Sequence, residues 1–368
     1  MSSISCEVKH LRIKTNGIWL HMVEQGAGPL VLLLHGFPEF WYSWRHQIAF
    51  LAKHGYHVVA PDLRGYGDSD APLSPTSYSV VHLVGDLISI LDHFGEQQVI
   101  ILSLSHTQTH AHTDTHDTCA RTHTRLSISN LFLIVILYEK AFIVGHDWGA
   151  VAGWFLCLSR PDRVKGFVSL SVPYFQRDPN TKAIESYRQV FGDGFYVCQF
   201  QEPGRAERAF ARYDYLTVMK KFLLITKTDI LIAPLGMELI DYLETSSLLP
   251  PWITEAELQV FADKFQESGF TGPLNYYRAM DLNWELLAAW QGTKVKVPVK
   301  FIAGDKDIGF ESTREYVKGD IFKQLVPNLE VVILDGHHFI QQERAQEVSE
   351  EILFFLRKVS LDGVSSQV

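Results

Sequence analysis

The sequence predicts an α/β protein built on a mostly parallel, doubly wound sheet, with a helical cap inserted into it. Short apolar segments typical of buried strands alternate with segments of helical apolar spacing, which indicates strand–helix–strand units. Residues 30–34 are apolar at every position, as in a strand buried on both faces of a parallel sheet. From residue 175 to 292 the sequence becomes aromatic-rich and helical. The core is therefore expected to comprise residues 1–174 and 293–368, and the cap residues 175–292.

Each expected element follows from its own pattern. Residues 7–26 alternate in polarity around Asn16 and Gly17, which predicts a hairpin with its turn there. The apolar spacing of residues 80–94 predicts a helix. Further strands are expected at residues 56–60, 141–144, 168–172, 299–303 and 331–334, and further core helices at 150–156 and 345–358.

Composition narrows the class of protein. The 368 residues, 46% of them hydrophobic, suffice for a large core, and the net charge of −9 argues against nucleic acid or an anionic membrane surface as a partner. The longest apolar run, residues 131–138, is too short to span a bilayer, and the first residues lack the layout of a signal peptide. Four scattered cysteines are typical of reduced thiols. We expect a cytoplasmic protein without a membrane span, and a monomer and a homodimer stay equally open.

The segment 99–140 departs from the rest of the chain. Thr and His recur there at nearly every other residue, as in a translated CA-dinucleotide repeat. Val99 can begin with GT and Lys140 can end with AG, the dinucleotides that bound an intron, and removing these 42 residues (140 − 99 + 1) joins the flanking segments in frame. A metal site is the alternative, but the His and Cys spacing matches no defined zinc site. We expect a retained intron without a stable fold over residues 102–130.

The strongest chemical signal is Asp147, which stands between two glycines. Gly145 and Gly149 lie two residues to either side of it, after an apolar strand and before an Ala-rich helix. This is the strand–turn–helix layout of a nucleophile elbow, in which a turn too tight for bulky neighbours presents the nucleophile. A carboxylate needs no base in order to attack carbon, and the ester that it forms must then be hydrolysed by water. The plain alternative is a turn whose aspartate caps the helix.

Two later segments supply candidate partners for Asp147. Asp307, with Asp305 as its rival, follows one strand of the resumed sheet. His338, with His337 as its rival, follows the last strand. The carboxyl ends of parallel strands meet at one edge of a sheet, so these side chains are expected to lie together. Nucleophile, acid and histidine in this chain order match a known catalytic triad, and we prefer Asp307 and His338 for the last two roles.

Two backbone amides and two phenols complete the expected site. The loop that begins at His35 follows a central strand, and its tight turn can aim the amide of Phe37 inward. Together with the amide of Trp148 it would form an oxyanion hole, with His35 as a further candidate for substrate binding. Tyrosine hydroxyls are neutral donors near pH 7, and Tyr196 and Tyr277 could together hold a departing oxygen. With 14 tyrosines in the chain, position alone does not single out these two.

Six motifs, taken together, resemble those of a known family. They are His-Gly-Phe-Pro-Glu at 35–39, Asp-Leu-Arg-Gly-Tyr-Gly-Asp-Ser at 62–69, Gly-His-Asp-Trp-Gly-Ala at 145–150, Phe-Gln-Glu-Pro-Gly at 200–204, Gly-Phe-Thr-Gly at 269–272 and Asn-Tyr-Tyr-Arg at 275–278. The family is that of the soluble epoxide hydrolases of the α/β-hydrolase fold, in the short plant-type form. The resemblance covers nearly the whole chain apart from residues 99–140.

The resemblance implies a mechanism and the residues that perform it. Asp147 would be the nucleophile, Asp307 and His338 its partners, and Tyr196 and Tyr277 the donors to the epoxide oxygen. An alkyl–enzyme ester would form and then be hydrolysed to a vicinal diol, with no metal or organic cofactor. The substrate would be a small-molecule epoxide from lipid or xenobiotic metabolism.

Two other functions stay open at this point. A haloalkane dehalogenase uses the same aspartate chemistry on a carbon–halogen bond, and Trp148 could serve there as a halide ligand. That family often has Asn where Phe37 stands, and it does not use two cap tyrosines. The other possibility is a catalytically impaired splice isoform, because the segment 99–140 leads directly into the strand that carries Asp147.

Overall fold

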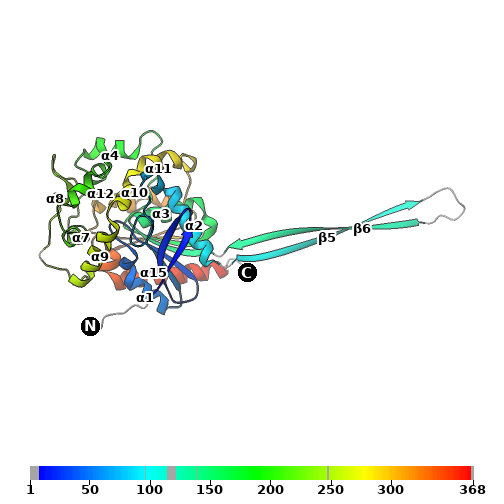
Figure 1. Ribbon diagram of the computed structural model, residues 1–368. Helices are drawn as coiled ribbons and strands as arrows, with labels where there is room; N and C mark the ends of the chain where they lie inside the picture. Colours follow the sequence, from blue (N-terminus) through cyan, green and yellow to red (C-terminus); the bar gives the residue numbers. More distant parts are fainter. Residues whose placement is uncertain (1–7, 96, 114–121, 139, 247, 366–368) are drawn as a thin grey trace. The chain divides into compact units, whose positions relative to one another are not determined.

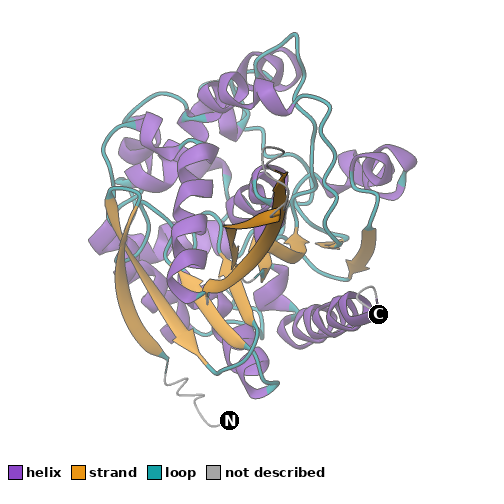
Figure 2. Cartoon of the chain, turned by 90° about the vertical axis from the view of Figure 1, so that its right-hand side faces the viewer, coloured by secondary structure: helices purple, strands orange, loops and turns teal. Residues whose placement is uncertain are grey.

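The computed structural model describes residues 8–95, 97–113, 122–138, 140–246 and 248–365. The chain divides into two compact units, a larger one formed by Met1–Phe94 with Lys140–Val368 and a smaller one formed by Gly95–Glu139. Helices lie on both sides of the sheet in the larger unit (Figures 1 and 2). Among the described residues, no helix combines the length and the apolar character needed to cross a membrane.

The larger unit is built on an eight-stranded sheet. Its strands are β1 (Lys9–Thr15), β2 (Ile18–Gln25), β3 (Leu30–Leu34), β4 (His57–Pro61), β7 (Ala141–His146), β8 (Val164–Leu170), β9 (Val299–Gly304) and β10 (Leu329–Leu334). They lie side by side in the order β1-β2-β4-β3-β7-β8-β9-β10. The β1–β2 and β2–β4 pairs are antiparallel and all the others are parallel. The expectation of a mostly parallel α/β sheet is therefore confirmed.

The central strands separate two apolar clusters, because alternate side chains point to opposite faces of the pleat. On one face, Val31 and Leu33 belong to a cluster with side chains of α1 (Arg45–Lys53) and α15 (Ala345–Ser365). On the other face, Leu32 and Leu34 belong to a cluster with side chains of helices that follow later strands. These helices are α2 (Val80–Phe94), α3 (Trp148–Ser159), α12 (Phe310–Lys318) and α13 (Asp320–Leu325). The sheet is thus wound on both faces, as predicted.

Between β8 and β9 the described residues form helices and add no strand to the sheet. These helices are α4 (Ala183–Phe191), α5 (Tyr196–Gln199), α6 (Arg205–Phe210), α7 (Tyr215–Leu223), α8 (Leu239–Tyr242), α9 (Glu255–Ser268), α10 (Thr271–Arg278) and α11 (Met280–Leu286), and they gather together in Figure 1. α9 begins with a capping box, in which Thr254 and Glu257 satisfy each other's backbone amides. Aromatic side chains of these helices, such as Phe261, join the same apolar cluster as α2 and α3. A last short helix, α14 (Ile340–Glu343), follows β10.

Two turns explain where strands begin and end. In the first hairpin, Asn16 has φ 47° and Gly17 has φ 86°, and two consecutive positive values are typical of the tight turn predicted there. β8 ends at Leu170, two residues before the predicted end of that strand, because Ser171 has φ 69° and leaves the extended conformation. A strand cannot continue through a residue with positive φ.

The smaller unit is a two-stranded antiparallel ribbon of β5 (Gln97–Thr113) and β6 (Thr122–Tyr138). Their residues pair without interruption along both strands. This differs from the expectation of no stable fold over residues 102–130, of which residues 114–121 lie outside the described residues. The segment is rich in threonine and isoleucine, whose β-branched side chains favour extended backbone. A ribbon of two strands is marginally stable in water when it is isolated.

Candidate active site

Asp147 lies between β7 and α3, as the residue immediately before the helix. Its backbone has φ 50° and ψ −119°, a conformation that residues other than glycine rarely adopt. A Cβ atom on Gly145 would lie 2.4 Å from the carbonyl oxygen of Gly149, and one on Gly149 would lie 2.1 Å from that of Leu34. The flanking glycines are therefore required by close packing. The turn presents Asp147 at the carboxyl edge of the sheet, as expected of a nucleophile elbow.

The loop after β3 brings a backbone donor to the Asp147 carboxylate. The amide nitrogen of Phe37 donates to Oδ1 of Asp147 at 2.7 Å. This approach depends on glycine at position 36, since a Cβ atom on Gly36 would lie 2.3 Å from Cβ of Asp147. A donor aimed at this oxygen can stabilise negative charge that develops on it during attack on an ester.

His35 and Trp148 lie on two sides of this loop and have different surroundings. His35 is buried, with Nδ1 3.0 Å from the carbonyl oxygen of Gly36 and Nε2 accepting from the amide of Leu63 at 3.0 Å. Burial lowers the pKa of His35, and both ring nitrogens have partners inside the protein. The structure therefore places His35 as a support of the loop rather than a group that reaches substrate. Trp148 begins α3, and its ring packs edge-on against Tyr277 with centroids 5.2 Å apart.

The structure brings His338 and Asp307 together at the same edge of the sheet. Nδ1 of His338 lies 2.7 Å from Oδ1 of Asp307, which is a short hydrogen bond to a carboxylate. Nε2 of His338 lies 3.9 Å from Oδ2 of Asp147. The three residues thus have the mutual arrangement of a nucleophile, a base and an orienting acid.

The two rival residues have other partners. His337 bonds through Nδ1 to Oε1 of Glu343 at 3.1 Å, and its own amide donates to the same carboxylate at 2.7 Å. Asp305 accepts a hydrogen bond from the amide of Gly336 at 3.2 Å. Both rivals therefore brace the loops that carry the triad, and the structure favours His338 and Asp307 for the site.

The charge state of His338 depends on the carboxylates around it. Burial by itself opposes protonation, but the negative charges of Asp307, Asp147 and Glu39 outweigh it and raise the pKa of His338 to about 9. The hydrogen bond that the His338 ring donates to the Asp307 carboxylate acts in the same direction. At neutral pH the imidazole is therefore protonated.

Tyr196 and Tyr277 project from two cap helices. Tyr196 begins α5 and Tyr277 lies near the end of α10, with their ring centroids 6.0 Å apart. Burial and then the charge of Asp147 raise the pKa of each phenol above its usual range. Both hydroxyls are therefore neutral donors at physiological pH, and both lie within the electrostatic range of Asp147.

Two cap motifs fix the positions of these two helices relative to each other. The Gln201 side-chain amide donates to the carbonyl of Tyr277 at 3.0 Å and to that of Val197 at 2.9 Å. Arg278 donates to the carbonyl of Phe200 at 3.1 Å and pairs with Glu207 at 2.8 Å. Phe-Gln-Glu-Pro-Gly and Asn-Tyr-Tyr-Arg therefore join α5 to α10 and fix the spacing of the two tyrosines.

A buried network beneath the site was not found from the sequence. Both oxygens of Glu39 are fully buried, and they accept hydrogen bonds from the Gly36 amide, His146, Gln341 and Gln342 at 2.8–3.1 Å. Burial raises the pKa of Glu39, but interactions with His146, His35 and the Gly36 amide prevail and lower it to about 2. The ring of His146 also bonds through Nε2 to the backbone carbonyl of His338 at 2.9 Å. Glu39 thereby links the Phe37 loop to the His338 loop.

A cavity of about 400 Å³ opens beside Trp148, between α3 and the cap. Most of its lining is apolar and aromatic, including Phe155, Tyr187 and Trp284. Polar groups such as Arg177 lie among its lining residues. A cavity with this lining suits a small molecule with an apolar substituent.

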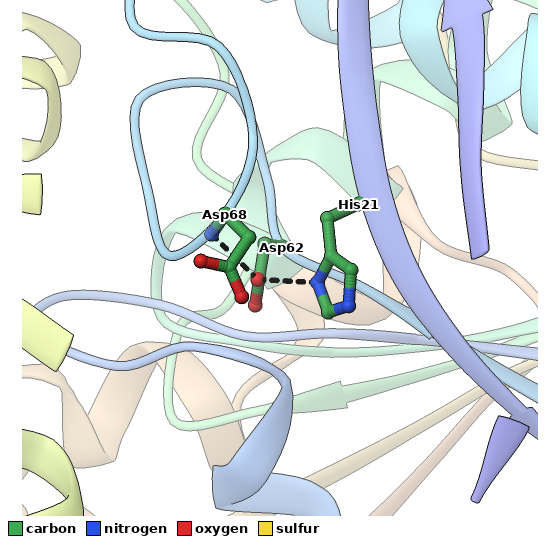
Figure 3. Close-up of side chains that lie close together, drawn as sticks. All are labelled: His21, Asp62 and Asp68. Atoms are coloured by element: carbon green, nitrogen blue, oxygen red, sulfur yellow. Dashed lines mark hydrogen bonds and ion pairs between the residues drawn. The ribbon is translucent and has the colours of Figure 1, made fainter. Parts of the chain in front are cut away.

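His21, Asp62 and Asp68 form a separate group of possible metal ligands, within 4.8 Å of one another (Figure 3). Oδ2 of Asp62 accepts hydrogen bonds from the His21 ring at 2.7 Å and from the Asp68 amide at 3.0 Å. Oδ1 accepts from the Trp41 amide at 2.9 Å, and the Lys264 ammonium group lies 2.8 Å from Asp68. Protein donors and a protein cation already satisfy these carboxylates. The group therefore braces the loop that begins at Asp62.

Comparison with known proteins agrees with the fold. The family model for the alpha/beta hydrolase fold matches residues 29–106. Epoxide hydrolase 2 of Siraitia grosvenorii is 45% identical over 358 residues, which cover 96% of this chain and 99% of the relative. Epoxide hydrolase A of Mycobacterium tuberculosis is 36% identical over 359 residues, covering 95% of this chain and 97% of the relative.

A solved structure extends the likeness to three dimensions. The crystal structure of an epoxide hydrolase from Vigna radiata matches with a TM-score of 0.82 at 41% identity, covering 97% of this chain and 100% of that one. Identity at this level over nearly the full length of several relatives establishes common descent. The chain therefore belongs to the epoxide hydrolase family of the α/β-hydrolase fold.

Proposed function

We propose that this protein hydrolyses epoxides to vicinal diols through an ester on Asp147. The position of the Asp147 carboxylate carries the proposal: the Phe37 amide holds Oδ1, and the His338 imidazole lies 3.9 Å from Oδ2. One oxygen is thereby engaged by a donor, and the other is left to attack carbon. The curated relatives of nearly equal extent, which are named epoxide hydrolases, support the same activity.

In the first step, Oδ2 of Asp147 attacks a ring carbon while Tyr196 and Tyr277 donate hydrogen bonds to the ring oxygen. A bond forms between the carboxylate and carbon, the ring C–O bond breaks, and the oxygen takes a proton from a tyrosine hydroxyl. The raised pKa values of both phenols support their role as neutral donors. The proton on His338 then returns to the tyrosinate, since the ester has removed the negative charge of Asp147 that favoured the imidazolium.

In the second step, the neutral imidazole of His338 takes a proton from water, and the resulting hydroxide attacks the ester carbonyl. The carbonyl oxygen is Oδ1, so the charge that develops on it is held by the Phe37 amide, together with the amide of Trp148 in our proposal. The tetrahedral intermediate collapses to the carboxylic acid and the diol alkoxide, which takes the acid's proton. The free enzyme is then restored with Asp147 ionised and His338 protonated.

A single turnover in water labelled with oxygen-18 tests this route. Attack on the ester carbonyl puts the label into the Asp147 carboxyl group and leaves the first diol unlabelled. Mass spectrometry of the peptide that contains Asp147 and of the diol measures both positions. Label in the first diol with none in the peptide would mean that water opens the ring directly, and the ester mechanism would be rejected.

Dehalogenation is the rival reaction, since the same carboxylate could displace a halide. The two phenols favour the epoxide, because a departing ether oxygen accepts their hydrogen bonds and their protons. An assay of one epoxide beside the chloroalkane of the same chain length separates the two reactions. Faster release of chloride than of diol would support the dehalogenase.

The cavity beside Trp148 supports an apolar substituent on the substrate, as in a lipid or xenobiotic epoxide. We propose that the substrate enters between the cap (residues 175–292) and the core (residues 1–174 and 293–368). A panel that compares fatty-acid epoxides, styrene oxide and a short polar epoxide distinguishes these classes by kcat/KM. A preference for the polar epoxide would contradict the assignment.

We propose that residues 99–140 are translated intron sequence and that the enzyme is complete without them. The pairing of Val99 with Ile136 supports this, because it places the first residue of the insert beside a residue four positions before its last. The flanks of the insert can then be joined by a short connection between α2 and β7. Transcript sequencing across residues 98–141 tests the origin of the segment.

A variant that lacks residues 99–140 tests the effect of the insert on activity. We expect the shortened chain to have equal or higher specific activity, and limited proteolysis of the full chain to cut first within the insert. An insert that resists protease, or a shortened chain that is insoluble, would contradict the proposal. The impaired isoform is the rival, and it predicts that only the shortened chain is active.

We also propose a cytoplasmic location. The two described cysteines, Cys157 and Cys198, are buried free thiols, which suits a reducing compartment, while Cys6 and Cys119 lie outside the described residues. Fractionation of cells that express the full chain checks the location. Light scattering on the purified protein decides between a monomer and a homodimer.

A further inference from the structure

Ser171 has an unusual backbone conformation at the carboxyl end of β8. Among the described residues other than glycine, positive φ occurs at Asn16, Asp147 and Ser171, with 69° at Ser171. Asn16 lies in a hairpin turn that requires it, and Asp147 lies at the elbow. In the β7–β8 pairing His146 is opposite Leu170, so Asp147 and Ser171 occupy equivalent positions after neighbouring parallel strands.

The backbone at Ser171 forms a γ-turn. The amide of Val172 donates to the carbonyl of Leu170 at 2.8 Å, across a central residue with positive φ, which is the rare and strained form of this turn. Its neighbours hold it in place: the Ser171 amide donates to the carbonyl of Ile302 at 2.9 Å, and the Trp154 ring donates to that of Val172 at 2.9 Å. Strain of this kind persists where the surrounding structure over-determines it, and it is concentrated at functional sites.

The turn aims the Ser171 hydroxyl at the His338 loop. Oγ of Ser171 donates to the backbone carbonyl of His338 at 3.1 Å, and the His146 ring bonds to the same carbonyl at 2.9 Å. Two donors from the ends of two neighbouring strands therefore fix this one carbonyl. Asp307 fixes the imidazole through Nδ1, so the ring of His338 is held at one end and its backbone at the other.

We propose that Ser171 is a positioning residue for His338 in hydrolysis of the ester. The inference rests on the proposed role of His338 as the base. With the His338 carbonyl held by Ser171 and the ring held by Asp307, Nε2 has one position relative to the carboxyl group of Asp147. His338 acts on water only after the ring has opened, so loss of the hydroxyl should slow hydrolysis of the ester and leave its formation unchanged.

Rapid-quench kinetics on the full-length enzyme separates these two steps. Ser171→Ala removes the hydroxyl, and Ser171→Gly removes it while relieving the backbone strain. For both variants we expect ester decay to slow about threefold to tenfold, the effect of one neutral hydrogen bond, with ester formation within twofold of wild type. The fraction of enzyme present as ester at steady state then rises, and kcat and KM fall together.

Ser169→Ala is the matched control. Its hydroxyl is also on β8, but it donates to the Val172 carbonyl, at 2.8 Å, and not to that of His338. We expect both rates of this variant to stay within twofold of wild type. A general loosening of the strand end would instead slow ester formation as well, and would affect the control equally.

Two results would overturn the inference. The first is an ester that decays in Ser171→Gly at the wild-type rate. The second is an equal slowing of ester formation and of ester decay in both Ser171→Ala and Ser171→Gly. Failure of the proposed function is distinguishable, because it would show in the wild-type enzyme as absence of any quenched ester on Asp147. A wild-type enzyme that accumulates and hydrolyses the ester, with Ser171 variants that behave identically, would reject the role of Ser171 alone.

Discussion

Nε2 of His338 lies 3.9 Å from Oδ2 of Asp147, whereas its Nδ1 lies 2.7 Å from Oδ1 of Asp307. The second contact is a hydrogen bond, and the first is too long to be one. The imidazole is nevertheless close enough for both carboxylates to favour its charged form and raise its pKa to about 9. Esterification of Asp147 removes one of these charges, so the same reaction that creates the ester also favours the neutral base that hydrolyses it.

Removal of the Asp147 carboxylate should abolish turnover. Asp147→Ala is expected to reduce diol release by more than about a thousandfold, because no other described side chain is held against the Phe37 amide as a nucleophile. Diol release on a small epoxide is the measurement. Asp305→Ala is a control in which a loop carboxylate outside the triad is lost. Retained turnover in Asp147→Ala, with its melting temperature unchanged, would remove Asp147 from the mechanism.

His338→Gln should trap the ester. Ring opening needs no base, so the variant is expected to form the alkyl–enzyme ester and then to stall, because no imidazole is present to activate water. Intact-protein mass spectrometry after mixing with epoxide should detect the added mass of one substrate. The matched control is His337→Gln, in the neighbouring residue, which should turn over normally. Accumulation of ester in the His337 variant instead would exchange the roles of the two histidines.

The two phenols should act on ring opening. Tyr196→Phe and Tyr277→Phe are each expected to slow ester formation about a hundredfold, within the range measured for loss of one oxyanion donor, and the double variant should show none. Single-turnover formation of the ester measures this. Tyr276→Phe, whose hydroxyl donates to the Arg64 carbonyl at 2.9 Å, is the control and should lose stability rather than rate. Equal losses in all three variants would point to packing.

The raised pKa of His338 should make stability depend on pH. The pKa of His338 is about 9 in the folded chain, against an ordinary value of 6.5 for the unfolded chain. The stabilisation is therefore complete below pH 6.5 and is lost as the pH rises through 9. We expect the free energy of unfolding to fall over this interval by up to about 3 kcal/mol. Urea unfolding across pH 6–10 measures it. Asp307→Asn should flatten the profile, and a profile parallel to wild type would contradict the assigned cause.

The buried Glu39 should be among the most sensitive positions outside the site. In Glu39→Gln a neutral amide replaces the carboxylate that accepts hydrogen bonds from the Gly36 amide and the His146 ring. We therefore expect the free energy of unfolding to fall by about 2–4 kcal/mol. Urea unfolding at pH 7 provides the measurement. Glu24→Gln, whose carboxylate pairs with the exposed Lys9 and with His57, is the control and should cost less than about 1 kcal/mol. A neutral Glu39→Gln would show that the network does not depend on its charge.

The sequence could predict groups that follow a strand directly. Asp147, Asp307 and His338 each stand at the end of an apolar run, and parallel strands bring their carboxyl ends to one edge. The hairpin turn could also be predicted, because it depends on only two adjacent residues, Asn16 and Gly17. The paired cap tyrosines came from resemblance to a family, since no local pattern separates them from twelve others.

Other features depend on contacts that no local pattern contains. Glu39 meets His146 and Gln341, which are 107 and 302 residues away in sequence. Ser171 lies within a segment that has the pattern of a strand, but its backbone turns there and its hydroxyl bonds to the carbonyl of His338, which is 167 residues away in sequence. Residues 97–113 and 122–138 pair with each other as two strands, which the unusual composition of this segment did not suggest.

The pairing of Gln97 with Tyr138 has a practical consequence. When the two ends of an inserted segment lie close together, the segment can vary in length without changing the fold of the domain that carries it. We therefore expect the connection between α2 and β7 to accept foreign sequence, such as a fluorescent reporter or an affinity module, in place of residues 99–140.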